Sequence, residues 1–165
     1  CNLNELVTAS LQHVRPQPGD SLVVDLPTDL PLLFVDPHRI EAVLRNLVEN
    51  AVKYTPEDTQ IRISAIRRPD DVVVYVADEG PGISQTDHRH VFESFYRVSS
   101  GLTQQAPGAG LGLSICQGFI HAHGGKIWLE PSEIGACIAF SLPASEETPD
   151  AAFSAAAELP GRASN

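Results

Sequence analysis

The chain has 165 residues, enough for one domain with a substantial hydrophobic core. Hydrophobic residues make up 42% of the sequence and charged residues 19%, which excludes a chain that is disordered throughout. The net charge of -10 leaves no basic surface for a nucleic acid, and no apolar run has the roughly 18 residues needed to cross a bilayer.

The cysteine pattern points away from a disulfide framework. Cys1, Cys116 and Cys137 are odd in number, widely spaced and without a CxxC pair. This pattern indicates neither a set of disulfides nor a structural zinc site, and it fits a reducing compartment. Because the chain begins with Cys1 rather than with methionine, we expect it to be a piece of a longer protein.

In the first third of the chain, short apolar segments alternate with prolines. Leu3–Leu11 has apolar residues at helical spacing and predicts a short amphipathic helix. Ser21–Leu26 and Leu32–Val35 are apolar runs bounded by proline, which is typical of strands. Pro37–Tyr54 predicts a longer helix, with Asp36 as its N-cap and proline at its first position.

Further along, strand and helix patterns follow one another. Ile61–Ile66 and Val72–Ala77 predict two strands joined by a hairpin turn. Leu111–His123 predicts a helix that two glycines end, and Lys126–Glu130 and Cys137–Leu142 predict a final pair of strands. The chain as a whole is therefore expected to form five or six strands and three main helices.

Two segments show no sustained apolar period. Ser99–Gly110 is rich in glycine and polar residues and predicts a long, mobile loop. Residues 144–165 contain mainly alanine, serine, proline and acidic residues, which predicts a disordered acidic tail.

The predicted helix 37–54 carries two separate stripes of side chains. One side is apolar and predicts the core face: Ile40, Leu44, Leu47 and Ala51. Asn46, Asn50 and Lys53 share another side. Two carboxamides and an ammonium in one line can coordinate a hard cation through oxygen and contact phosphate oxygens, as a magnesium nucleotide requires. The alternative is a solvated helix face without a function.

Two segments containing glycine offer further binding groups. Asp78 opens the sequence DEGPGI at the end of an apolar strand, where its carboxylate could accept a hydrogen bond from an exocyclic amine such as that of adenine. Gly108–Leu113, with the sequence GAGLGL, enters a helix and offers backbone N–H groups to an anion. Its spacing matches neither the dinucleotide fingerprint nor the P-loop. The alternatives are a turn without a function and a flexible hinge.

Taken in order, these motifs closely resemble the catalytic and ATP-binding domain of sensor histidine kinases, in the GHKL (HATPase_c) family that also includes gyrase, Hsp90 and MutL. The resemblance spans about residues 20 to 143 and rests on five motifs: the N box Asn46–Tyr54, the G1 box Asp78–Ile83, the F box Phe92–Arg97, the G2 box Gly108–Leu113 and the closing strand Gly135–Pro143. It implies the Bergerat fold, a two-layer α/β sandwich. In that fold a mixed, mostly antiparallel sheet packs on about three helices beside a mobile ATP lid.

The resemblance also implies a function and partners. The domain would bind ATP and Mg²⁺ and transfer the γ-phosphoryl group to a histidine on a separate dimerisation domain, with a response regulator acting downstream. Residues 1–19 would be a linker helix from that missing domain, 20–143 the catalytic domain and 144–165 the tail. The parent would be a cytoplasmic homodimer, with an inner-membrane anchor as an option. This fragment would contact neither nucleic acid nor membrane directly.

Site roles follow from the resemblance, position by position. Asn50 would bind Mg²⁺ through its side-chain oxygen, and Asp78 would accept a hydrogen bond from the adenine amine. Asn46, Lys53 and Arg97 would lie near the phosphates as the catalytic candidates. The remaining nucleotide-binding residues would be Tyr54, Gly80, Gly82, Ile83, Gly108, Gly110, Leu111, Gly112 and Leu113. Phe92 and Phe95 would pack at the base of the lid, and Ala136 stands where the family often has threonine.

Asn46 favours phosphoryl transfer over hydrolysis. Relatives that hydrolyse ATP place glutamate at this point to activate water, and an amide cannot act as a base. Glu49 is the runner-up base, but it lies off the polar stripe. An anti-sigma-factor-type serine kinase, which would require glutamate near position 46, and a non-catalytic, ATP-dependent regulatory module are the alternatives.

The histidines have no acceptor context. None of the six is followed by an acid and then a proline, the pattern usual around a phosphorylated histidine, so the acceptor is expected on another domain. His88 with His90, and His121 with His123, are spaced for divergence on a helix, which predicts surface residues rather than metal ligands.

Overall fold

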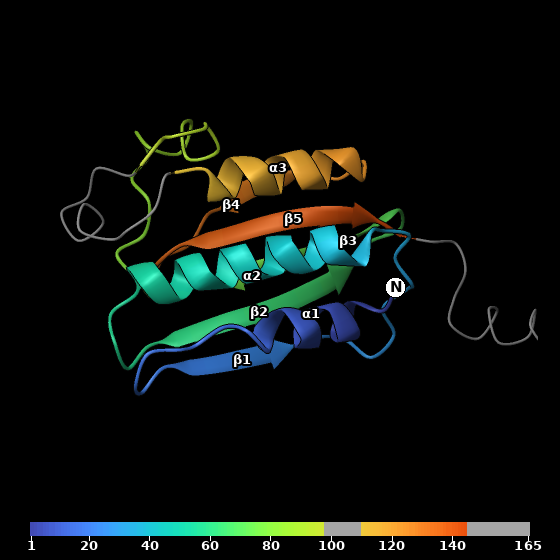
Figure 1. Ribbon diagram of the computed structural model, residues 1–165, viewed down its shortest axis with the longest axis horizontal. Helices are drawn as coiled ribbons and strands as arrows, with labels where there is room; N and C mark the ends of the chain where they lie inside the picture. The colour runs from blue at the N-terminus through green and yellow to red at the C-terminus, as the bar shows by residue number, and fades with distance from the viewer. Residues whose placement is uncertain (98–109, 145–165) are drawn as a thin grey trace, which may run out of the picture.

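The computed structural model describes residues 1–97 and 110–144. Three helices cover one face of a five-stranded sheet, which gives two layers (Figure 1). In chain order the elements are α1 (Leu3–Leu11), β1 (Ser21–Asp25), α2 (Pro37–Tyr54), β2 (Gln60–Arg67), β3 (Asp71–Ala77), α3 (Gly112–Ala122), β4 (Ile127–Glu130) and β5 (Cys137–Pro143). The predicted two-layer α/β sandwich is confirmed. None of the helices in the described ranges has the length and apolar character that a membrane span requires.

The sheet has the order β1-β2-β3-β5-β4. β1 runs parallel to β2, and every other neighbouring pair is antiparallel, so the sheet is mixed and mostly antiparallel as predicted. The register places Val76 opposite both Ile63 and Ile138. Because β5 runs antiparallel to β3, its first residues lie beside the end of β3. This pairing brings two loops that are far apart in sequence to one edge of the sheet.

The core lies between the sheet and the helices. Every second residue of the central strands belongs to it: Ile61, Ile63 and Ala65 of β2, and Val72, Val74 and Val76 of β3. The buried residues of α2 extend the predicted core stripe: Ile40, Val43, Leu44, Leu47, Val48 and Ala51. Leu3, Leu6 and Val7 of α1 belong to the same core, so α1 packs as part of this layer. Its expected role as a linker from a dimerisation domain stays a prediction.

Capping residues determine where α2 begins and ends. The Asp36 carboxylate accepts hydrogen bonds from the N–H groups of His38 at 3.0 Å and Arg39 at 3.3 Å, which confirms the predicted N-cap. Thr55 follows the last helical residue in an extended conformation, and Pro56 comes next. The rotation of the helix, and with it the direction of its polar stripe, follows from the packing of its buried stripe against the sheet.

His123 joins the end of α3 to the start of α2. Its Nδ1–H donates to the Phe119 carbonyl at 2.7 Å, and its Nε2 accepts from the Asp36 N–H at 3.0 Å. The residue is therefore half-buried and bonded on both ring nitrogens, whereas a surface histidine was expected. No group of three or more metal-ligating side chains exists in the described ranges.

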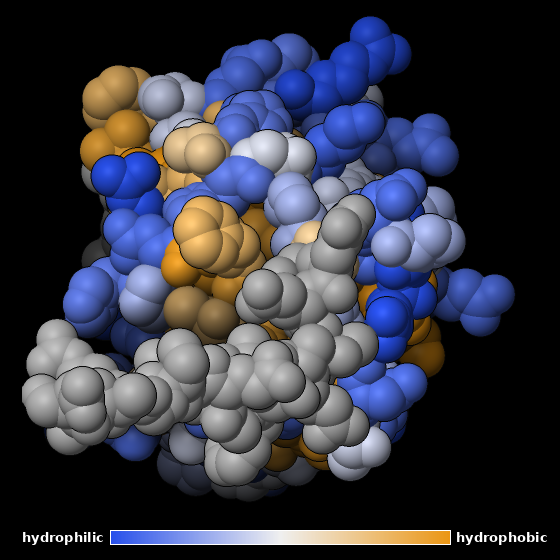
Figure 2. Space-filling view, turned by 90° about the vertical axis from the view of Figure 1, so that its right-hand side faces the viewer, coloured by the Kyte–Doolittle hydropathy of each residue, from blue (hydrophilic) through white to orange (hydrophobic). Residues whose placement is uncertain are grey.

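The expected strand at Leu32–Val35 is wrong. Within it, Leu33 forms an isolated antiparallel bridge with Ala144. The Leu33 N–H donates to the Cys1 carbonyl at 2.8 Å and its carbonyl accepts from the Cys1 amino group at 2.7 Å, so these groups are not available to a ladder. Phe34, next to it, is 94% exposed. On the face of the molecule that Figure 2 shows, apolar side chains interrupt a mainly hydrophilic surface.

Cys116 is buried in the core, whereas Cys137 is only half-buried at the start of β5. Burial raises the pKa of the Cys116 thiol to about 12. Burial, with the nearby Glu130 and Asp78 carboxylates, raises the pKa of Cys137 to about 11. Both residues therefore stay protonated at neutral pH and are poor nucleophiles.

Two predictions lie outside the described residues. The loop predicted at Ser99–Gly110 is described only at Gly110, and the tail predicted at 144–165 is described only at Ala144. Both stay predictions.

Candidate functional site

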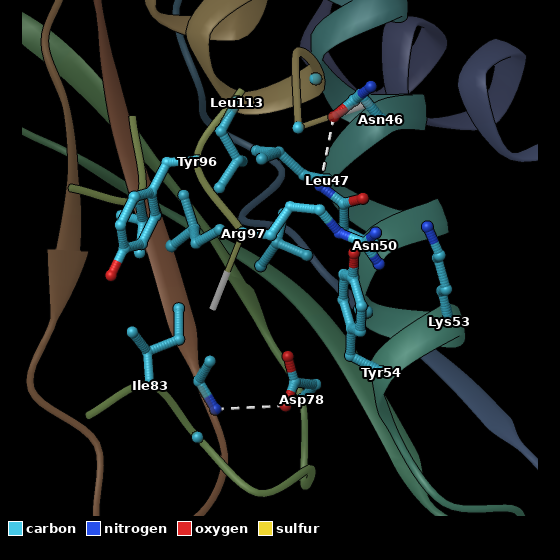
Figure 3. A pocket seen from close by; sticks show the side chains of 18 of the residues that line it. Asn46, Leu47, Asn50, Lys53, Tyr54, Asp78, Ile83, Tyr96, Arg97 and Leu113 are labelled. Carbon is cyan, nitrogen blue, oxygen red and sulfur yellow. Dashed lines mark hydrogen bonds between the residues drawn. The ribbon is translucent and has the colours of Figure 1, made fainter. Parts of the chain in front are cut away.

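A cavity of about 290 Å³ opens between α2, the end of β3 and the start of α3 (Figure 3). Its apolar wall comes from these elements, from β5 and from the segment after β3: Leu47, Ala51, Val76, Ile83, Val91, Leu113 and Ile138. Its polar groups are two carboxamides, one carboxylate and two cationic side chains: Asn46, Asn50, Asp78, Lys53 and Arg97. A mostly apolar cavity with a few polar groups of both charges suits a ligand with a flat apolar part and an anionic part.

The cavity brings together nearly all the residues that were predicted for the site. It is lined by Asn46, Asn50, Lys53, Tyr54, Asp78, Gly82, Ile83, Arg97, Gly110, Leu111, Gly112 and Leu113. Gly80 is not among the lining residues, but its N–H donates to the Asp78 carboxylate at 2.8 Å. Gly108 lies outside the described residues. Pro81, Val91 and Tyr96 also line the cavity and were not predicted.

Asp78 is held by the backbone on both sides. Its N–H donates to the Ala136 carbonyl at 2.9 Å, and its Oδ1 accepts from the N–H groups of Gly80 at 2.8 Å and Ala136 at 3.1 Å. The other carboxylate oxygen points into the cavity (Figure 3). Burial raises the pKa of Asp78, and the two N–H bonds partly offset that rise. One oxygen is thus anchored while the second is left for a hydrogen-bond donor.

Gly135 permits the close approach of two loops beside Asp78. It has a left-handed φ of +66°, and a Cβ there would lie 1.9 Å from the Asp78 backbone oxygen. Gly82 faces it with a φ of +74°, and a Cβ on Gly82 would lie 2.9 Å from the Gly135 oxygen. Gly135 was not among the predicted site residues. Its place as the first residue of the closing motif Gly135–Pro143 was the available signal.

Asn46 orients Asn50. The Asn50 Nδ2 donates to the Asn46 Oδ1 at 3.3 Å, so the Asn50 Oδ1 is left to other partners (Figure 3). The Asn46 carboxamide in turn lies against the first residue of α3, where a Cβ on Gly112 would be 2.6 Å from the Asn46 Oδ1. A side chain at position 112 would therefore displace the Asn46 carboxamide from its present place between the two helices.

The donor set fits Mg²⁺ held together with an anionic ligand. A carboxamide oxygen is a suitable hard ligand, and Mg²⁺ in nucleotide sites takes few protein ligands because phosphate oxygens supply the rest. The described part of the chain offers no cluster of three acidic, histidine or cysteine side chains that would hold a cation alone. The amide oxygen of Asn50 suits the cation, and the two cationic side chains suit the phosphates that would carry it.

The start of α3 presents backbone donors to the cavity. Leu111 is its N-cap and makes no side-chain capping bond among the described residues. Leu111, Gly112 and Leu113 line the cavity. Uncapped N–H groups and the positive end of the helix dipole favour an anion at this position.

Arg97 and Lys53 reach the cavity from opposite sides. Arg97 extends from the segment after β3 towards Asn50 and Tyr54 (Figure 3). Lys53 lies over the Tyr54 ring, with Nζ 5.1 Å from the ring centroid. Both cations therefore approach the part of the cavity that Asn50 lines.

The two F-box phenylalanines differ from one another. Phe92 is partly buried against the core, and its expected contact with the lid stays a prediction. Phe95 is 72% exposed and does not pack against the core. Its φ of +66° turns its side chain outward, which residue spacing could not indicate.

A family model described as histidine kinase-, DNA gyrase B-, and HSP90-like ATPase matches residues 35–146. The adaptive-response sensory kinase SasA of Synechococcus sp. (strain JA-2-3B'a(2-13)) is 44% identical to this chain over 121 residues, which is 72% of this chain and 32% of the relative. The SasA of Nostoc sp. (strain PCC 7120 / SAG 25.82 / UTEX 2576) is 42% identical over 72% of this chain and 30% of the relative. The chain spans about a third of the length of these relatives.

Solved structures agree over most of the chain. The catalytic domain of histidine kinase ThkA has a TM-score of 0.74 and 32% identity, covering 87% of this chain and 95% of that domain. The mycobacterial sensor histidine kinase MprB has a TM-score of 0.79 and 26% identity, covering 87% of this chain and 97% of that one. ThkA in complex with the response regulator TrrA has a TM-score of 0.72 and 31% identity, covering 88% of this chain and 41% of that one.

Proposed function

Because the chain belongs to the family of histidine kinase-, DNA gyrase B- and HSP90-like ATPases, as a catalytic domain of the sensor histidine kinase type, we propose that it binds Mg²⁺-ATP in the cavity and passes the γ-phosphoryl group to a histidine. That histidine would lie on a dimerisation domain of the parent protein. The observation that carries the proposal is the Asp78 carboxylate, with one oxygen anchored by two N–H groups and the other open to a cavity that also holds Asn50 and two cations.

In this proposal the end of β3 recognises the base. The open oxygen of Asp78 accepts a hydrogen bond from the adenine amine. Gly80 and Gly82 have no side chains, so the base can approach the backbone beside Asp78 closely. Tyr54, Ile83 and Leu113 supply the flat apolar contacts that a purine needs. Ala136 adds little bulk to the cavity wall, so a base contact from threonine is absent at this position.

The start of α3 and the polar stripe of α2 receive the phosphates. Lys53 and Arg97 neutralise their negative charge, and Asn46 orients Asn50 from the neighbouring turn of the helix. Gly110, Leu111 and Gly112 supply backbone donors at the positive end of α3, as Gly108 would from its position in the same motif. Positioning and charge neutralisation provide most of the catalysis in phosphoryl transfer.

Asn50 would hold Mg²⁺ through its Oδ1. When bound, Mg²⁺ neutralises phosphate charge and fixes the orientation of the γ-phosphoryl group. The orientation of the Asn50 amide supports this role, since its nitrogen is already bonded to Asn46.

Transfer to a histidine is favoured over hydrolysis. The residue one turn before Asn50 is an amide that cannot accept a proton, and the neighbouring Glu49 is exposed to solvent. Among the described residues, Asp78 is the one carboxylate that lines the cavity. One of its oxygens accepts from backbone N–H groups and the other would accept from the base, so neither would activate a water molecule.

Phosphoryl transfer itself can be tested with two separate proteins. The chain is incubated with γ-labelled ATP, Mg²⁺ and the purified dimerisation domain of its own parent protein. We expect label on that domain that is stable to alkali and labile to acid, as a phosphohistidine is. Acid-stable label would indicate a serine kinase, and saturable ATP binding without any label would indicate a regulatory module.

Asn50→Ala should weaken ATP binding only when Mg²⁺ is present. We expect at least about a tenfold rise in Kd with Mg²⁺ and little change in EDTA, because the lost group is an oxygen ligand of the cation rather than a contact of the base. Calorimetric titration measures both values. Glu49→Ala, next to it on the exposed side of α2, is the matched control and should bind as the wild type does. Equal Mg²⁺ dependence in Asn50→Ala and wild type would contradict the metal assignment.

We also propose that a response regulator acts downstream of this domain. The ThkA relative, 31% identical, was solved in complex with the response regulator TrrA.

A further inference from the structure

The segment that connects β3 to Arg97 contains a buried carboxylate outside the cavity. Asp87 is only 7% exposed. Its Oδ2 accepts from the Ser84 hydroxyl at 2.6 Å, and its Oδ1 accepts from the Tyr96 hydroxyl. The Asp87 N–H also donates to the Ser84 Oγ at 3.3 Å, so Ser84 and Asp87 form a reciprocal capping pair. Asp87 thus connects the two ends of the segment 84–96 through its hydrogen bonds with Ser84 and Tyr96.

The protonation states of Asp87 and Tyr96 are well defined. The hydrogen bonds from Ser84 and Tyr96, aided by His90 and His88, lower the pKa of Asp87 despite its burial. The Asp87 bond, burial and the nearby Glu93 raise the pKa of Tyr96. At neutral pH the pair is therefore a carboxylate that accepts from a neutral phenol. His90 stacks near the Tyr96 ring with 5.3 Å between centroids, and its Nδ1 pairs with Glu93 at 2.8 Å.

Tyr96 stands where the segment meets the start of α3. The Phe95 N–H donates to the Gly110 carbonyl at 3.0 Å, and a Cβ on Gly110 would lie 2.7 Å from the Tyr96 carbonyl oxygen. Phe95 has a left-handed φ of +66°, which is unfavourable for a residue of this size and persists only where the surroundings enforce it. The bonds on either side of Phe95 supply that constraint.

Successive side chains leave this point in opposite directions. The Tyr96 hydroxyl points away from Asn50 and Asp78, and Arg97, the next residue, points across the cavity towards Asn50 (Figure 3). The Tyr96 ring lines the cavity while its hydroxyl is engaged by Asp87 outside it. The direction of Arg97 therefore depends on how the backbone at Tyr96 is held.

We propose that Asp87 is a positioning residue, which holds Tyr96 by its hydroxyl and thereby directs the Arg97 guanidinium towards the phosphates of the nucleotide. The inference rests on the proposed function, since it assigns to Asp87 a role in the same site. Asp87 itself touches no ligand. Its effect is on the phosphate part of the nucleotide and not on the base, because Arg97 and Asp78 act at different parts of the cavity.

Tyr96→Phe tests this directly, because the ring that lines the cavity stays and only the link to Asp87 is lost. We expect ATP binding to weaken by roughly fivefold, the effect of one hydrogen bond, while adenosine binding changes less than about twofold. Asp87→Asn, whose amide oxygen can still accept from Tyr96, should keep most of the ATP affinity. Gln85→Ala, on the exposed side of the same segment, is the matched control and should leave both affinities unchanged.

A double-mutant cycle with Arg97→Ala separates positioning from a general structural role. If Asp87 and Tyr96 act through Arg97, Tyr96→Phe should have no further effect on ATP affinity in the Arg97→Ala protein. The proposal is overturned if Tyr96→Phe weakens ATP and adenosine equally, or if its effect persists without Arg97. If the wild-type protein bound ATP no more tightly than adenosine, the proposed function would be overturned first, and this inference with it.

Discussion

Asp78→Asn is expected to abolish measurable ATP binding while the domain stays folded. Asparagine has nearly the same shape, and its oxygen can still accept from the N–H groups of Gly80 and Ala136. Its NH₂ group then faces the cavity, where the adenine amine also offers a donor. The charged acceptor is lost, and the NH₂ groups of asparagine and adenine oppose each other as two donors. Together these two effects should raise the Kd for ATP by at least about 100-fold.

Calorimetric titration of ATP at pH 7.5 measures this change. Glu79→Gln, the exposed neighbour of Asp78, is the control and should bind as the wild type does. A folded Asp78→Asn protein with wild-type affinity would mean that the base is recognised elsewhere.

The same substitution should not lower stability at neutral pH. Burial raises the pKa of Asp78 above its usual value of 3.8, so the folded protein binds this proton more tightly than the unfolded chain does. Between the pKa of Asp78 in the unfolded chain and its higher pKa in the folded protein, the contribution of Asp78 to the free energy of unfolding falls as pH rises. Asp78→Asn should therefore melt at the same or a higher temperature than wild type at pH 7.5, and its advantage should shrink at pH 4. A lower melting temperature at pH 7.5 would contradict the direction of the pKa shift.

Gly135→Ala should be strongly destabilising. The new methyl group would lie 1.9 Å from the Asp78 backbone oxygen and 2.9 Å from its Oδ1, on a residue with a φ of +66°. The loop cannot withdraw easily, because Ala136 is bonded to Asp78 through both its N–H and its carbonyl. We expect the free energy of unfolding to fall by about 2–4 kcal/mol, through a steric clash and backbone strain together. Urea denaturation measures the loss.

Gly118→Ala provides the matched control with the opposite sign. Gly118 lies in the middle of α3, and a Cβ there would meet nothing within 4 Å. Because alanine restricts the unfolded chain and favours helix, the free energy of unfolding should rise by about 0.5–1 kcal/mol. If Gly135→Ala were as stable as Gly118→Ala, the close approach of the two loops at Asp78 would be wrong.

The elements that could be predicted are those whose signals are local. The apolar period of α2, its Asp36 cap, the alternation in β2 and the apolar run of β3 each lie within one segment, and the structure has a helix or a strand at each of them. Leu32–Val35 carries a similar apolar signal, but its backbone pairs with the chain terminus rather than with a sheet. A short apolar run does not specify its partner, and for this reason the prediction failed.

The candidate site divides in the same way. Its predicted residues came from recognisable motifs, and the cavity brings nearly all of them together. The link between Asp87 and Tyr96 was not predicted, because a hydrogen bond between two side chains nine residues apart in an irregular segment has no periodic signature. The outward turn of Phe95 depends on that same irregular backbone.

The sequence by itself determined the three helices, the five strands of the sheet and the two stripes of α2, because backbone geometry sets their periods within a single segment. It also determined the family, through the order of its motifs. Only the tertiary structure decided which backbone groups anchor Asp78, since Ala136 lies 58 residues away and reaches it through the pairing of β3 with β5. The same holds for the contact of Asn46 with Gly112, which depends on how α2 and α3 pack over the sheet. Contacts between distant segments follow from strand register and helix packing, and these depend on the whole core at once.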